Sequence, residues 1–87
     1  MNVIYSEIAV KQLAKLDKHI QSRILIYMDE IAALEDPFSR GHGLTGNEKG
    51  YWRFRVDDMR IICRINEVQL EILVVRLGNR REVYRHR

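Results

Sequence analysis

The chain has 87 residues, enough for one compact domain (residues 1–87), and its 46% hydrophobic and 31% charged residues are typical of a globular rather than a disordered protein. Residues 1–48 hold five Lys+Arg against seven Asp+Glu, whereas residues 49–87 hold ten against five, and nine of those ten cations are arginine. With one cysteine and no long apolar run, the sequence predicts a cytoplasmic protein without a disulfide framework, membrane segment or signal peptide.

The first 37 residues predict one short strand followed by two helices. Residues 2–5 form the strand, and Ser6 is suited to cap a helix that runs to about Leu16. We expect the buried side of that helix to carry Ala9, Val10, Leu13 and Leu16. Asp17 can cap a second helix, which ends at Asp36-Pro37 because the residue before proline avoids helical geometry. Its apolar stripe, which should pack in a helical hairpin, consists of Ile20, Ile24, Tyr27, Met28, Ile31 and Leu34.

Residues 39–50 predict a loop, because four of the five glycines in the chain lie there. No Gly-Lys-Ser/Thr follows them and no strand precedes them, so we interpret these glycines as turn residues and not as a phosphate-binding loop.

From Tyr51 onward the hydrophobic pattern changes to a period of two. Apolar Trp52, Phe54 and Val56 alternate with arginines up to a turn at Asp57-Asp58. Residues 59–65 return as a second strand, and the nearly continuous apolar run 70–77 predicts a central strand after a turn at Asn66-Glu67. The fold class is therefore α+β, in the order β-α-α-β-β-β, with the helical hairpin packed on a mostly antiparallel four-stranded sheet.

Arginines concentrate on one face of this sheet. If Phe54 faces the helices, Arg53 and Arg55 point to the other face, roughly 6–7 Å apart. The returning strand can bring Arg60 and Arg64 beside them, and the end of the chain adds further cations and one aromatic ring: Arg80, Arg81, Tyr84, Arg85, His86 and Arg87. Guanidinium groups pair with phosphates and an aromatic ring stacks on a base, so this pattern favours binding of a single RNA strand. A solvated basic surface is the alternative.

Other chemistries lack the residues they need. The three histidines are far apart and lack metal-ligand spacing, so we expect no metal and no cofactor. No serine lies in a nucleophile motif. Cys63 lies in an apolar strand, which favours an inert core thiol, and Asp57-Asp58 is better explained as a turn than as a catalytic pair.

Three segments resemble the RelE/ParE superfamily of type II toxins: Tyr51-Trp52-Arg53-Phe54-Arg55-Val56, Met59-Arg60-Ile61-Ile62, and the run from Leu77-Gly78-Asn79-Arg80-Arg81 through Tyr84-Arg85. With the two helices, the resemblance covers essentially the whole chain and implies a RelE-like fold. The ending is similar to the RelE branch, whose members are mRNA interferases that cleave messenger RNA in the ribosomal A site. The ParE branch inhibits DNA gyrase and usually lacks that ending.

The resemblance implies a metal-independent endoribonuclease in which the 2′-hydroxyl of the RNA attacks the adjacent phosphate. Arg53 and Arg60 would neutralise the phosphate, Arg80 would protonate the leaving oxygen, and Tyr84 would orient the target nucleotide. Arg53 and Arg55 stand at the paired strand positions where well-known members have lysine. Arginine is a poor general base, so catalysis would depend on positioning and electrostatics. The predicted contacts to RNA and the ribosome are Arg64, Arg81, Arg85 and Arg87.

The resemblance also implies partners. These are a cognate acidic antitoxin of the RelB kind, which would cover the apolar helix pair and the basic groove, and the 70S ribosome with its messenger RNA. Two other functions stay open on the same fold: a ParE-like gyrase inhibitor, and a catalytically inactive toxin homologue that serves as a binding scaffold.

Overall fold

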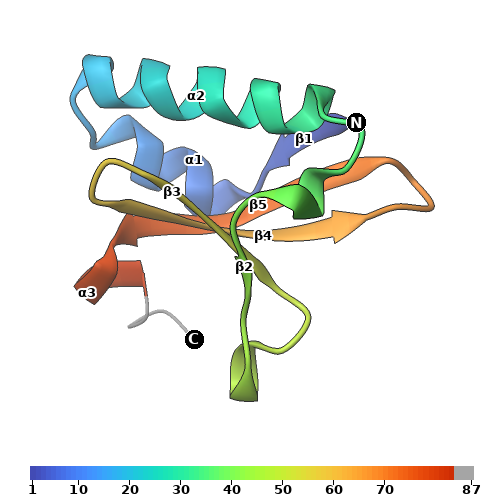
Figure 1. The fold of residues 1–87 in the computed structure, drawn as a ribbon. Coiled ribbons are helices and arrows are strands. Elements are labelled where there is room, and N and C mark those ends of the chain that lie inside the picture. Colours follow the sequence, from blue (N-terminus) through green and yellow to red (C-terminus); the bar gives the residue numbers. More distant parts are fainter. Residues whose placement is uncertain (84–87) are drawn as a thin grey trace.

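The structure, a computed structural model, describes residues 1–83 and arranges them as a helical pair on one face of a five-stranded mixed sheet (Figure 1). The helices are α1 (Glu7–Ala14) and α2 (Lys18–Ala33). The strands, in spatial order, are β1 (Asn2–Tyr5), β5 (Glu71–Asn79), β4 (Met59–Asn66), β3 (Trp52–Val56) and β2 (His42–Gly43). β1 runs parallel to β5 and the other neighbours are antiparallel, so the predicted α+β class is confirmed.

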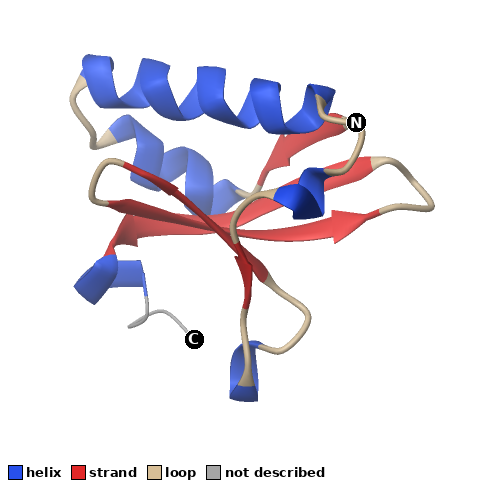
Figure 2. Ribbon diagram, in the orientation of Figure 1, coloured by secondary structure: helices blue, strands red, loops and turns tan. Residues whose placement is uncertain are grey.

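Three shorter helices complete the described chain. The 3-10 turns η1 (Pro37–Ser39) and η2 (Gly46–Glu48) flank β2, and the one-turn helix α3 (Arg80–Val83) follows β5. Figure 2 shows α3 and η2 on the side of the sheet away from α1 and α2. In the described part of the chain, no helix combines the length and apolar character that crossing a bilayer requires.

The two long helices begin where the sequence predicts. Ser6 Oγ accepts a hydrogen bond from the amide of Ala9 at 3.0 Å, and Asp17 Oδ1 accepts one from the amide of His19 at 2.9 Å. Each cap satisfies an amide that has no partner within its helix, which stabilises the fold by about 1 kcal/mol. α1 ends at Ala14, two residues before the predicted Leu16.

The core lies between the helices and the sheet. From α2 it takes Ile24, Met28 and Ile31, as the predicted stripe requires, and from the strands Phe54, Val56, Ile61, Cys63, Ile72, Val74 and Leu77. The prediction for α1 is partly wrong: Ala9 is buried, but Val10 is 53% exposed. An eight-residue helix that lies flat on the sheet has room for only a narrow buried stripe, and Val10 falls outside it.

The predicted loop 39–50 contains one more strand. His42 and Gly43 pair with Arg53 and Trp52 of β3, so a two-residue fifth strand extends the four expected ones. Gly41 makes this approach possible: it has φ +75°, and a Cβ there would collide with the carbonyl oxygen of Arg53. Gly46 and Gly50 also have positive φ and serve as turn residues.

Candidate functional site

A hollow of about 500 Å³ opens where β2, β3, β4 and α3 meet, and we call it the basic pocket. Its lining is Tyr27, Gly41, His42, Arg53, Arg55, Arg60 and Arg80. Four of these seven residues are arginines, and they come from three separate elements. The structure therefore brings together the four arginines that the sequence singled out for chemistry, within the described residues.

The β3–β4 hairpin fixes the centre of this pocket. Because side chains alternate along a strand, burial of Phe54 against the helices turns Arg53 and Arg55 to the opposite side. The two-residue turn at Asp57-Asp58 then places Arg60 directly across from Arg55. Arg55 is held by its own hairpin, since its Nε donates to the carbonyl oxygen of Asp57 at 3.1 Å.

Arg80 reaches the pocket from the end of β5. Asn79 closes that strand opposite Met59, and its Oδ1 accepts a hydrogen bond from the amide of Arg81 at 3.1 Å. This contact begins α3 and turns the chain so that Arg80 lines the basic pocket. Arg60, Arg80 and Arg81 also line a shallower neighbouring hollow, so the positive surface continues past the pocket over the start of α3.

Arg64 does not join this cluster. It lies four residues beyond Arg60 on β4, roughly 13 Å along the strand, and its guanidinium sits 5.3 Å from the centre of the Tyr51 ring. A guanidinium over a tyrosine face is a cation–π contact, which orients the side chain at the other end of the sheet. The predicted Tyr84, Arg85 and Arg87 lie outside the described residues.

Arg76 on β5 is a charged residue that the fold buries. It forms an ion pair with Glu48 and does not lie free at the strand surface. The opposite face of the sheet is not all solvent-exposed, because Ile62 of β4 and Val83 of α3 are fully buried outside the main core cluster.

Two pocket residues, His42 and Tyr27, were not predicted. A two-residue strand leaves no periodic signal, so nothing in the sequence showed that His42 pairs with Arg53. Tyr27 was assigned to the apolar stripe of α2. Its ring does pack edge-on against Phe54, with ring centres 6.2 Å apart, while another part of it borders the pocket.

Cys63 does not line the basic pocket. It is fully buried in the core, and burial strongly raises the pKa of its thiol, which keeps it in the unreactive protonated form. Residues 1–83 hold no group of three or more His, Cys, Asp or Glu side chains placed to bind a metal ion.

The arrangement is suited to an anion. Four guanidinium groups repel one another unless negative charge lies between them, and each can donate two parallel hydrogen bonds to a phosphate. The pocket is open on one side, so a chain of phosphates could pass through it and continue over Arg81.

The profile of a family described as "ParE toxin of type II toxin-antitoxin system, parDE" matches residues 3–84 of the chain. No curated protein matches the chain by sequence. Among solved structures, the toxin–antitoxin complex RelBE2 from Mycobacterium tuberculosis superposes with a TM-score of 0.82 at 20% identity, over 91% of this chain and 90% of that chain.

Two archaeal complexes are also similar. The RelE–RelB complex from Pyrococcus horikoshii OT3 has 25% identity and a TM-score of 0.71, with 91% of this chain and 93% of that chain covered. The RelB–RelE complex from Methanococcus jannaschii has 23% identity and a TM-score of 0.73, with 97% and 98% covered. The shared architecture is that of RelE-like toxins, two helices on an open mixed sheet.

Proposed function

The chain belongs to the ParE toxin family of type II toxin–antitoxin systems, within the RelE/ParE superfamily, and from that premise we propose that it is an endoribonuclease that cuts messenger RNA on the ribosome. The observation that carries the proposal is the basic pocket, in which Arg53, Arg55, Arg60 and Arg80 line one hollow. Guanidinium groups form paired hydrogen bonds with phosphate oxygens, so four of them lining one open pocket are suited to hold the phosphodiester backbone of RNA.

The reaction is an internal transfer at phosphorus. The 2′-oxygen of the RNA bonds to the adjacent phosphorus, the bond to the 5′-oxygen breaks, and the products are a cyclic phosphate and a 5′-hydroxyl end. Arg53 and Arg60 stabilise the charge that gathers on the phosphate oxygens, and Arg55 fixes the backbone of the strand. Arg80 passes a proton to the leaving 5′-oxygen and regains it from water.

His42 can supply the general base, a role for which the arginines are poorly suited. A guanidinium keeps its proton at neutral pH and is a poor base, whereas a neutral imidazole can accept the proton that leaves the 2′-hydroxyl. His42 lies opposite Arg53 in the β2–β3 pair and lines the same pocket, so we assign it this role. Tyr27 lines the pocket and can stack on the target nucleotide. Tyr84 lies outside the described residues, and the role that the resemblance implies for it stays a prediction.

The partner that restrains this activity is an acidic antitoxin. The similar structures from M. tuberculosis, P. horikoshii and M. jannaschii are toxin–antitoxin complexes, which supports such a partner here. On this chain, Val10 and Leu25 are exposed apolar side chains that border a hollow between α1 and α2. An apolar helix of the partner can lie in this hollow while an acidic segment covers the basic pocket.

The test is expression of the chain without its partner, followed by mapping of the 5′ ends of cellular messenger RNA. Cuts inside translated codons are expected for the wild type and are expected to vanish in Arg80→Ala. Lys11→Ala is the matched control, because it also removes one exposed cation but lies on α1, away from the pocket. The same cuts in Arg80→Ala and the wild type would show that the pocket is not the catalytic site.

A second function is favoured by the family profile itself, which is that of ParE toxins. Under this alternative the chain inhibits DNA gyrase by binding it. Growth arrest with intact messenger RNA, together with inhibition of supercoiling by the purified protein, would replace the ribonuclease proposal. Absence of growth arrest would indicate a toxin homologue that has lost activity.

A further inference from the structure

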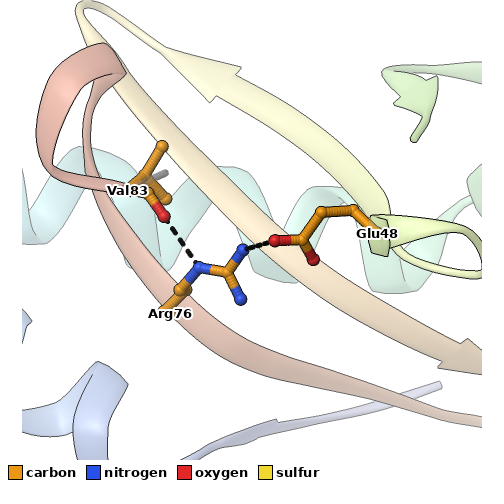
Figure 3. Close-up of polar contacts among 3 residues, drawn as sticks. All are labelled: Glu48, Arg76 and Val83. Carbon is orange, nitrogen blue, oxygen red and sulfur yellow. Dashed lines mark hydrogen bonds and ion pairs between the residues drawn. The ribbon is translucent and has the colours of Figure 1, made fainter. Parts of the chain in front are cut away.

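Arg76 joins three segments that are far apart in the sequence. Its Nε donates a hydrogen bond to the carbonyl oxygen of Val83 at 2.8 Å, and its Nη2 donates to Oε1 of Glu48 (Figure 3). The side chains of Arg76 and Glu48 are only 8% and 14% exposed. One guanidinium on β5 thus connects the loop at η2 with the last turn of the described chain.

This ion pair is not needed to fill the core. The main core lies on the other face of the sheet, between the strands and helices α1 and α2. Burying a guanidinium and a carboxylate costs solvation free energy, and well-packed apolar residues of the same volume generally stabilise a protein at least as well. The best-attested use of such a buried pair is to fix one arrangement of the elements that it joins.

α3 is the element whose position this ion pair can hold. It has four residues, too few for a helix to be stable by itself. It also carries Arg80 to the basic pocket, where Arg53, Arg55 and Arg60 already lie, so charge repulsion tends to push α3 away from the sheet. The contacts that oppose this include the buried Val83, the Asn79 cap and the hydrogen bond from Arg76 to the end of α3.

We propose that Arg76 and Glu48 are positioning residues, a buried clamp that holds α3 against β5 and so keeps Arg80 in the basic pocket. Neither residue lines that pocket. Glu48 acts through Arg76, because its carboxylate neutralises and orients the guanidinium whose Nε binds α3. The consequence for RNA cleavage rests on the proposed function, whereas the anchoring of α3 does not.

The experiment compares the wild type with Glu48→Gln and Glu48→Ala. Glu48→Gln keeps the size of the side chain and a hydrogen-bond acceptor but removes the charge. Glu67→Ala is the matched control, because it removes one carboxylate from the exposed β4–β5 turn. Hydrogen–deuterium exchange is measured for the amides of residues 80–83 and, as a reference, for the buried amides of residues 61–63. The kcat and KM for ribosome-dependent cleavage are then measured on the same proteins.

In Glu48→Ala, exchange at residues 80–83 should be at least tenfold faster while residues 61–63 stay unchanged. Cleavage should lose at least tenfold in kcat with little change in KM, because the RNA still meets Arg53, Arg55 and Arg60. For Glu48→Gln, both the exchange rate at residues 80–83 and the kcat should lie between those of Glu48→Ala and the wild type. If Glu48→Ala does not fold, the test is made with Glu48→Gln. A merely structural role would instead raise exchange throughout the sheet.

Unchanged exchange at residues 80–83 in the Glu48 variants would overturn the clamp, and so would faster exchange with an unchanged kcat. If the wild type cuts no messenger RNA, the proposed function fails, and the clamp is judged from exchange and from the affinity for inorganic pyrophosphate. Pyrophosphate would be held by the basic pocket alone, whereas RNA is also held by the ribosome, so a weaker pyrophosphate affinity in Glu48→Ala would then support the clamp, and equal affinities would overturn it.

Discussion

Arg55 and Arg60 are direct cross-strand neighbours on β3 and β4, on the side of the hairpin that borders the basic pocket. Side chains in this relationship have Cβ atoms roughly 4.5–5.5 Å apart, and like charges placed so destabilise the pair. The free protein therefore holds a repulsive contact at the site where a phosphate would lie.

The first prediction follows from this pair. Arg60→Gln should raise the free energy of unfolding by about 0.2–1 kcal/mol at low ionic strength, because it removes the repulsion, and the gain should shrink as salt screens the charges. Cleavage should fall by about 10²–10³-fold, since a donor to the developing charge is lost. Chemical denaturation measures the first effect. A double-mutant cycle with Arg55→Gln checks it, because strictly additive changes would show that the two arginines do not interact.

The second prediction concerns His42. If it accepts the proton of the 2′-hydroxyl, His42→Gln should lower kcat by about 100-fold and leave RNA binding nearly unchanged, since general base catalysis contributes that much. Single-turnover cleavage on ribosomes measures the loss. His19→Gln is the control, because His19 is exposed near the start of α2 and does not line the pocket. Equal rates for His42→Gln and the wild type would remove His42 from the mechanism.

The sequence was informative wherever a periodic pattern is long enough to be recognised. The alternation in Trp52–Val56 predicted both the strand and the face on which Arg53 and Arg55 lie, and the spacing along α2 predicted its buried stripe. The two-residue β2 has no such pattern. It forms because Gly41 lets the chain approach β3, and this tertiary contact is what brings His42 into the site.

Burial of single charged side chains was likewise not predictable. Arg76 lies on the same side of the sheet as Ile62, and both are covered by elements that come from elsewhere in the chain. Strand alternation tells which face a residue occupies, but not whether a later segment such as α3 closes over that face. Arg64, on the same strand as Arg60, stays exposed although the Tyr51 ring lies against its guanidinium.

The third prediction is a pH dependence at Tyr5. Its hydroxyl is buried without a hydrogen-bond partner among the described residues. Burial first, and then the nearby charge of Asp29, raise the pKa of Tyr5 to about 12, from 10.0. The folded state therefore holds this proton more tightly than the unfolded state. The contribution of the protonated Tyr5 to the free energy of unfolding is fully present below about pH 10 and is lost as the pH rises toward 12.

Tyr5→Phe tests this. The variant removes a buried polar group that has no partner, so it should be more stable at neutral pH by about 1 kcal/mol. It should also lose less stability than the wild type between pH 10 and pH 12. The difference between the two proteins isolates Tyr5 from the lysines that titrate in the same range. Parallel stability curves over that range would show that the hydroxyl is solvated in the folded state.

The fourth prediction concerns the thiol of Cys63. Burial raises its pKa far above the usual value, so the native thiol should react with a thiol-directed reagent only when the protein opens. The labelling rate at neutral pH should therefore match the rate of global unfolding and rise with denaturant in the same way. Cys63→Ala should leave the cleavage rate unchanged and lower stability through the small cavity that it creates. Fast labelling under native conditions would contradict the buried position.

The last prediction tests the surface proposed for the antitoxin. Val10 is 53% exposed on α1 and borders the hollow between the two long helices, together with Leu25. A carboxylate placed in an apolar interface must be desolvated without a partner, which opposes binding by more than about 1 kcal/mol. Val10→Asp should thus weaken binding of the antitoxin encoded with this chain at least tenfold, as measured by titration calorimetry.

Val68→Asp is the matched control, because Val68 is 94% exposed on the β4–β5 turn, outside this hollow. The two variants carry the same change of residue and of charge, so a general electrostatic effect on an acidic partner would weaken both equally. A selective loss in Val10→Asp, with cleavage of messenger RNA preserved, would separate the docking surface from the catalytic pocket. Such a variant should be more toxic than the wild type when the antitoxin is present, since it escapes restraint while its arginine cluster stays intact.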